Sequence, residues 1–121
     1  MEATKVYIAD TEDLKLYKND HVDGFTFEVL NKPIPPAEGT PYDFGAFTDV
    51  FLKIYKARKT ELLVTIPNNI NGVQIAANII TWNSDYSTDI NLSINTYYYE
   101  LSYLDVDSKL ITVLFGNLIV I

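Results

Sequence analysis

The amino-acid sequence predicts an all-β protein, an antiparallel β-sandwich of about seven to nine strands. Three observations lead to this fold class. Apolar and polar side chains alternate along most of the chain, which is the period of a half-buried strand. Short segments rich in Gly, Asn, Asp and Ser separate these runs at the spacing typical of sandwiches. The chain has 121 residues, 48% of them hydrophobic and none of them Cys, so one domain can bury a core without disulfides.

The alternation is plainest in the segment 48–57. Val50, Leu52 and Ile54 share one face of the expected strand, which should be the buried face. The outward face carries Asp49, Phe51, Lys53 and Tyr55. A charged turn then leads into residues 60–66, so the two segments are predicted to form a hairpin.

Further strands are expected over 24–30, 71–82, 96–104, 109–115 and 118–121. Segment 71–82 is long enough for two short strands joined by a turn at Ala77-Asn78. Residues 105–108 have the Asp-rich composition of a turn between two strands. Gly116-Asn117 is expected to break or bulge the last apolar run. The final segment, Leu-Ile-Val-Ile, is expected to be a strand paired inside a sheet.

Three segments depart from the strand pattern. Residues 87–93 begin with Ser, Thr and Asp, and predict at most one short helical turn. The segment 31–44 holds four of the five prolines and is expected to be a rigid extended loop. Residues 1–12 are expected to form an N-terminal arm, flexible or ordered by a partner, ahead of a single sandwich domain over 13–121.

The charge balance argues against some classes of partner. Sixteen acidic residues outnumber nine basic ones, and the net charge of −7 repels phosphate backbones, so we expect no nucleic-acid partner. The first residues carry no apolar core of a signal peptide, and no apolar run approaches the roughly 20 residues that a membrane helix needs. We therefore expect synthesis in a cytoplasm and no membrane partner.

The sequence contains no recognisable catalytic or metal-binding motif. His21 is the only histidine, and no nucleophile motif accompanies it, so a solvated turn residue is favoured over a catalytic one. The acidic residues most suggestive of calcium are Asp20, Asp23, Asp105 and Asp107. Neither pair belongs to the D-x-[DN]-x-[DN]-G loop with a closing glutamate that binds calcium. We expect no enzyme activity, no metal and no cofactor.

Seven residues are candidates for partner binding. They are Lys53, Tyr55, Lys56, Arg58, Lys59, Tyr98 and Trp82. The five between 53 and 59 form either a solvated hairpin tip or a docking patch for an acidic neighbour, including another copy of this chain. Tyr98 should point away from the core, on the opposite face to Tyr97 and Tyr99. Trp82 either packs in or beside the core or stacks on a sugar.

The order of several motifs resembles a known family. The segments are YKND at 17–20, GFTF at 24–27, PYDFG at 41–45, YYYEL at 97–101 and LFGNLIV at 114–120. Together they are similar to an Ig-like β-sandwich domain of tailed-bacteriophage virion proteins, found at the N-terminus of baseplate upper proteins and in short head or tail proteins. The resemblance covers most of the chain. Asn95-Thr96 stands where the family usually has a glycine.

The resemblance implies a structural protein of the virion without catalytic residues. Because the sequence ends with the expected domain, the first expectation is an auxiliary or decoration protein of the capsid, which binds and stabilises neighbouring shell subunits. Its partners would be other virion proteins, foremost the major capsid protein, with copies of itself as a further possibility. The alternatives are a tail, baseplate or head-fibre adaptor and, more distantly, a carbohydrate-binding module.

Overall fold

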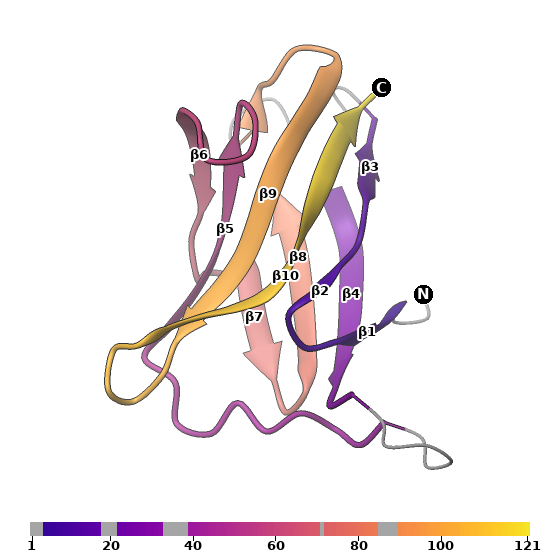
Figure 1. Cartoon of the computed structure of the whole chain (residues 1–121). Helices are drawn as coiled ribbons and strands as arrows, with labels where there is room; N and C mark the ends of the chain where they lie inside the picture. The colour runs from indigo at the N-terminus through magenta and orange to yellow at the C-terminus, as the bar shows by residue number, and fades with distance from the viewer. Residues whose placement is uncertain (1–3, 18–21, 33–38, 71, 85–89) are drawn as a thin grey trace.

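The protein is a sandwich of two β-sheets, as the sequence predicts (Figure 1). The computed structural model describes residues 4–17, 22–32, 39–70, 72–84 and 90–121. Every regular element within these residues is a strand. Most neighbouring strands are antiparallel, but three pairs that involve the first part of the chain are parallel.

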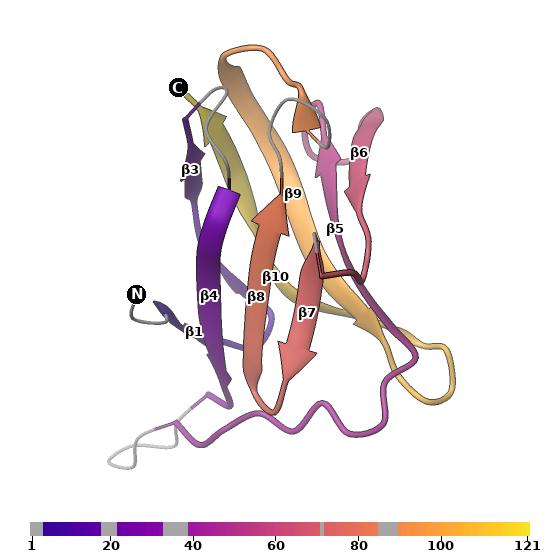
Figure 2. The same ribbon diagram turned by 180° about the vertical axis from the view of Figure 1, so that it is seen from behind.

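The smaller sheet has four strands in the order β1-β4-β8-β7 (Figure 2). They are β1 (Thr4–Tyr7), β4 (Val22–Leu30), β8 (Ile79–Ser84) and β7 (Val73–Ala76). The predicted turn at Ala77-Asn78 is confirmed, because it joins β7 and β8 into an antiparallel hairpin. Ala77 has a φ of 54°, the left-handed conformation that such tight turns need.

The larger sheet has six strands, with β2 and β3 pairing one after the other along the same edge of β10. The strands are β2 (Asp10–Thr11), β3 (Leu14–Leu16), β10 (Leu110–Val120), β9 (Asn95–Leu104), β5 (Asp49–Tyr55) and β6 (Leu62–Ile66). The predicted β5–β6 hairpin is confirmed. The turn at 105–108 likewise joins β9 to β10 as predicted.

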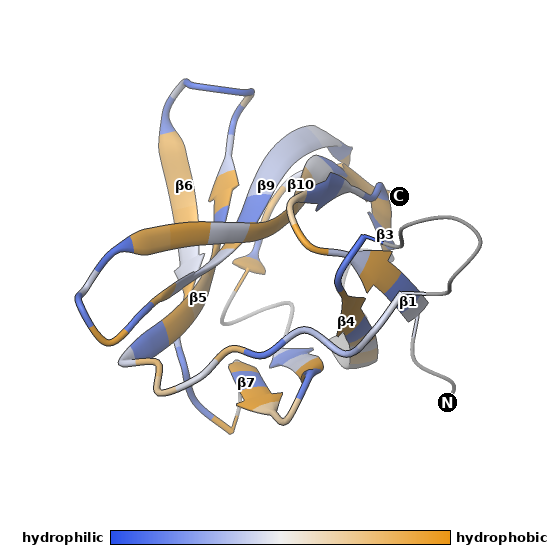
Figure 3. Ribbon diagram, turned by 60° about the horizontal axis from the view of Figure 1, so that its bottom comes forward, coloured by the Kyte–Doolittle hydropathy of each residue, from blue (hydrophilic) through white to orange (hydrophobic). Residues whose placement is uncertain are grey.

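The core lies between the sheets and follows the predicted alternation. Val50, Leu52 and Ile54 of β5 are fully buried, and the residues between them are only partly buried. From the opposite sheet, Phe27 and Val29 of β4 are buried as well. Apolar residues are frequent in the strands and polar residues in the connecting turns, as expected of strands with one buried face (Figure 3).

The structure places residues 4–11 differently from the expected arm. Strand β1 pairs with β4, and Val6 is buried in the core. Strand β2 pairs with Leu114 and Phe115 of β10. The chain therefore crosses from one sheet to the other between Tyr7 and Asp10, and it closes one side of the sandwich. Its strands were missed because two to four residues are too short to display a period.

The last strand is also more continuous than the sequence suggests. β10 runs from Leu110 to Val120, and its register with β9 shifts between Thr112 and Leu114, not at Gly116-Asn117. Its final residues pair with β9 on one side and with β3 on the other, so the expected internal position of the last strand is confirmed. Gly116 does not form a bulge; it lets the backbone at Glu12 approach β10 closely, because an added Cβ would lie 2.5 Å from the Glu12 carbonyl oxygen.

Two predicted irregular segments are described only in part. Of the expected helical turn at 87–93, residues 87–89 lie outside the described residues, Ile90 is π-helical, and residues 91–93 are not helical. Of the proline-rich loop at 31–44, residues 33–38 lie outside as well. The described remainder of that loop is tied to β4, because the Asn31 N–H donates to the Thr40 carbonyl and the Tyr42 N–H to the Val29 carbonyl.

Candidate binding surface

The described residues offer no metal centre, since they contain no group of three His, Cys, Asp or Glu side chains that could hold an ion. His21 and Asp20, two of the residues weighed for chemistry, lie outside that part of the chain. Asp105 has a turn-forming role, because its carboxylate accepts hydrogen bonds from the backbone N–H groups of Asp107 and Lys109, both at 2.9 Å. None of the described segments is a helix long and apolar enough to span a membrane.

The turn between β5 and β6 is a hydrogen-bonded loop that carries three cationic side chains. The Lys56 N–H donates to the Glu61 carbonyl at 2.9 Å, and the Ala57 N–H donates to Thr60 Oγ1 at 2.7 Å. The Thr60 hydroxyl in turn donates to the Ala57 carbonyl at 2.7 Å. These bonds fix the path of the turn, so the side chains of Lys56, Arg58 and Lys59 start from defined positions.

Arg58 reaches from this turn back over the outer face of the larger sheet. Its guanidinium carbon lies 6.0 Å from the ring centre of Tyr98 on β9 and 6.0 Å from that of Phe115 on β10. Both distances lie at the outer limit of cation–π attraction, and Arg58 is exposed. Within the described part of the chain, Arg58 has no carboxylate at ion-pair distance. The guanidinium is therefore held by two rings while its N–H donors stay available.

Tyr98 is the floor of this surface. Its side chain is only 8% exposed although it points away from the core, because Tyr55 and Arg58 cover it. The ring of Tyr55 lies 6.1 Å away, and the Tyr98 hydroxyl donates to Glu100 Oε1 at 3.1 Å. Burial and the negative charge of Glu100 raise the pKa of Tyr98, while Arg58 acts in the opposite direction. Burial and Glu100 also raise the pKa of Tyr55.

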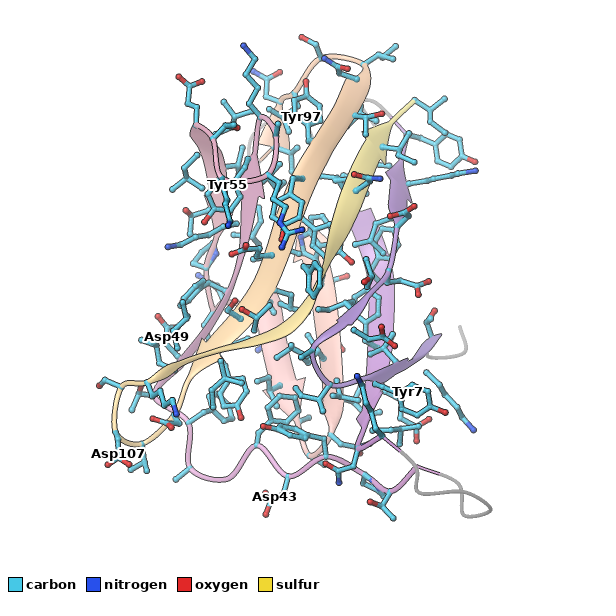
Figure 4. The ribbon with its side chains drawn as sticks, in the orientation of Figure 1. Tyr7, Asp43, Asp49, Tyr55, Tyr97 and Asp107 are labelled. Atoms are coloured by element: carbon cyan, nitrogen blue, oxygen red, sulfur yellow. The ribbon has the colours of Figure 1, made fainter. Side chains whose placement is uncertain are left out.

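A groove of about 390 Å³ lies between the β5–β6 turn and the neighbouring strands. Its walls include Arg58, Tyr98, Phe115, Thr11, Asp13 and Thr96. A smaller hollow of about 180 Å³ on the Glu100 side shares Arg58, Tyr98 and Phe115. Figure 4 shows Tyr55 on this face of the sandwich, far from the end that bears Asp107.

The carboxylates beside the groove already have partners. Asp13 Oδ1 accepts a hydrogen bond from the Asn117 N–H at 3.1 Å, and Glu100 accepts one from the Tyr98 hydroxyl. Each of these bonds uses one carboxylate oxygen, and the groove itself is lined by two cationic side chains, Lys56 and Arg58, and one carboxylate, Asp13. An anion or a carbonyl oxygen is the group that such a surface can hold.

The structure brings four of the seven candidate residues together. Lys56, Arg58 and Tyr98 line the groove, and Tyr55 packs against Tyr98. Lys59 is exposed in the same turn, with a φ of 58°. Lys53 lies elsewhere on β5, with its ammonium 5.1 Å from the Phe51 ring centre.

Trp82 requires a correction, because it is 1% exposed and faces the interior from the smaller sheet. Its ring stacks on Phe25 at 5.6 Å, and its indole N–H donates to Ser84 Oγ at 2.7 Å. An enclosed ring has no face for a sugar or a protein partner, so Trp82 belongs to the core and not to a binding surface.

Sequence reasoning missed Phe115 and the wall formed by Thr11 and Asp13. Phe115 sits beside the buried Leu114 in an apolar run, and only the register of β10 with β9 shows that it shares a face with Glu100. Thr11 and Asp13 reach the groove through the parallel pairing of β2 and β3 with β10. No local signal in the sequence marks either contribution.

Comparison of the chain with protein-family models, with curated protein sequences and with solved structures finds no match.

Proposed function

We propose that the protein is a bacteriophage virion structural protein, an auxiliary or decoration protein of the capsid that binds neighbouring shell subunits. The assignment to a virion rests on the order of sequence motifs along the chain, from YKND at 17–20 to LFGNLIV at 114–120. In this role the sandwich is a rigid body that presents a binding surface, and many weakly bound copies stabilise a shell together.

The observation that carries the binding role is the position of Arg58. A cation fixed over Tyr98 and Phe115, without an ion pair among the described residues, is arranged for an intermolecular contact. Arginine and tyrosine are also the residue types that most often dominate binding energy at protein interfaces. The surface lies on the face of the larger sheet that points away from the core, where a neighbouring subunit has access.

The two alternatives differ in what supports them. A tail, baseplate or head-fibre adaptor draws on the same motifs and the same surface. A carbohydrate-binding module loses its main support, because its expected stacking residue, Trp82, is enclosed in the core.

Copy number in purified particles tests the proposal. The protein would be quantified against the major capsid protein by mass spectrometry in the phage that encodes it. A fixed ratio corresponding to copies on the order of hundreds is expected for a capsid auxiliary protein, since closed symmetry repeats one contact over the shell. A few copies per particle would transfer the protein to the tail or a vertex. Absence from particles would overturn the virion role.

A matched pair of variants connects the surface to that role. Arg58→Glu reverses the charge over the two rings, and Lys15→Glu makes the same change at an exposed residue of β3. When each is supplied to particles that lack the native protein, Arg58→Glu is expected to lower incorporation and Lys15→Glu to leave it unchanged. Equal incorporation of the two variants would place the contact elsewhere on the molecule.

A further inference from the structure

The groove beside Arg58 is lined by two cationic side chains, Lys56 and Arg58, and by one carboxylate, Asp13. Asp13 and Glu100 each accept one hydrogen bond within this chain, whereas the guanidinium contacts two aromatic rings and has no ion pair among the described residues. The rings hold the side chain without using its N–H groups, and the turn that carries it is internally hydrogen-bonded. A ligand would thus meet a fork of donors that is already in place, which lowers the entropic cost of binding.

The walls restrict the ligand further. Tyr98 and Phe115 offer apolar surface next to the guanidinium, and Thr11 and Thr96 add exposed hydroxyl groups. A ligand that fits these walls has a carboxylate at the end of an aliphatic stem. The groove is open, and about 390 Å³ is enough for one or two side chains of an extended peptide.

The charges around the groove decide against a polyanion. Asp13 and Glu100 lie on two sides of Arg58, and the whole chain carries a net charge of −7. A run of phosphates or of successive acidic residues would meet repulsion immediately outside the guanidinium. A single acidic side chain flanked by neutral residues avoids this repulsion.

We propose that this groove binds an extended peptide segment of a partner protein through one glutamate or aspartate side chain, whose carboxylate is held by the guanidinium of Arg58. The aliphatic stem of the acidic residue packs against Tyr98 and Phe115. The neutral peptide residues on either side of it lie next to the hydroxyl groups of Thr11 and Thr96. The inference rests on the binding role proposed above, and it does not depend on the partner being a shell subunit.

The experiment is a titration of the isotope-labelled full chain, followed by nuclear magnetic resonance. The probes are the blocked peptide Ac-Gly-Leu-Glu-Leu-Gly-amide, the same peptide with Gln in place of Glu, and inorganic phosphate. The Glu peptide is expected to shift the Arg58 side-chain N–H signal and the backbone signals of Tyr98 and Phe115. The Gln peptide is expected to bind at least about tenfold more weakly, since a charge-assisted pair is lost.

Three variants locate the contact. Arg58→Gln is expected to abolish the difference between the Glu and Gln peptides, and Arg58→Lys to retain only part of it, because an ammonium lacks the planar fork. Lys15→Gln, on the exposed face of β3, is the control and should bind both peptides as the native protein does.

Several outcomes would overturn the inference. They are equal binding of the Glu and Gln peptides, signal shifts outside the groove, the absence of any shift, and tighter binding of phosphate than of the Glu peptide. The last result would assign the groove to a phosphate group instead. Failure of this titration leaves the copy number in particles unaffected, so it is distinguishable from failure of the virion role.

Discussion

The hydroxyl group of Tyr99 donates a hydrogen bond to the carbonyl oxygen of Glu12, directly beside Gly116. Tyr99 and Gly116 are opposite each other in the β9–β10 pair. Glu12 also donates its N–H to the Phe115 carbonyl at 3.0 Å. The Glu12 carbonyl, between β2 and β3, is therefore held by the Tyr99 hydroxyl of β9. Its close approach to β10 is possible because Gly116 has no side chain. This arrangement explains how the N-terminal segment becomes part of the sandwich.

Substitution of Gly116 by Ala is expected to destabilise the protein by about 1–3 kcal/mol. The new Cβ would stand 2.5 Å from the Glu12 carbonyl oxygen and 3.1 Å from the carbonyl carbon, so the backbone between β2 and β3 must move. Urea unfolding followed by circular dichroism measures the change in the free energy of unfolding. An unfolding free energy of Gly116→Ala equal to that of the native protein would show that the segment around Glu12 moves aside without cost.

Tyr99→Phe is expected to lower the free energy of unfolding by about 1–3 kcal/mol, because the Glu12 carbonyl loses its phenol partner. Tyr17→Phe, which removes a hydroxyl from a side chain that is 61% exposed, is the control and should have little effect. The double variant Tyr99→Phe/Gly116→Ala tests the relationship itself. Without the Tyr99 hydroxyl, the Glu12 carbonyl should move away from the new methyl group more easily. The double variant should therefore lose less unfolding free energy than the two single variants lose in sum. Strict additivity would contradict a shared contact.

Alkaline pH is expected to destabilise the protein through Tyr99. Burial, followed by the nearby charges of Glu12 and Asp13, raises the pKa of Tyr99 far above its ordinary value of 10.0. Below pH 10 both the folded and the unfolded chain keep this proton. Above pH 10 the unfolded chain releases it while the folded chain retains it, so stability falls with rising pH, by up to about 1.4 kcal/mol per pH unit.

Unfolding free energies measured between pH 9 and 12 would check this effect. The native protein is expected to lose stability more steeply than Tyr99→Phe, which lacks the titrating group. Some slope should remain in the variant, because burial and the hydroxyl of Tyr42, 2.5 Å away, also raise the pKa of Tyr103. Identical slopes for the two proteins would mean that Tyr99 ionises in the folded state.

The sequence was most informative where a strand is long enough to show its period. β5 has seven residues, and its alternation correctly indicated the buried face. In the ten residues of β9 the alternation indicated the core face, but Tyr98 and Ser102 on the other face are buried as well. β2 has two residues and β3 has three, so neither shows a pattern that differs from a loop. Their parallel pairing depends on contacts with β10, about a hundred positions later in the chain, which no local pattern encodes.

The candidate surface was predictable in the same partial way. The cationic turn and the outward direction of Tyr98 follow from composition and alternation. The position of Arg58 over Phe115 depends on two hairpins lying side by side, and is visible only in three dimensions. Trp82 was left open between the core and a binding surface, because it sits near the end of a predicted strand. At that place the period alone does not tell whether the opposite sheet extends far enough to cover the ring; the structure places the ring in the core.

The fluorescence of Trp82 provides a direct test of its burial, since it is the only tryptophan. The emission of the native protein is expected at shorter wavelength than that of the unfolded chain, with weak quenching by acrylamide. Ser84→Ala should leave the indole N–H without its 2.7 Å partner and lower the free energy of unfolding by about 1–3 kcal/mol. Monosaccharides added to the native protein should leave the spectrum unchanged, because the ring faces Phe25 and the core. Strong quenching in the folded state, or a spectral shift on adding a sugar, would return Trp82 to the surface and revive the carbohydrate-binding alternative.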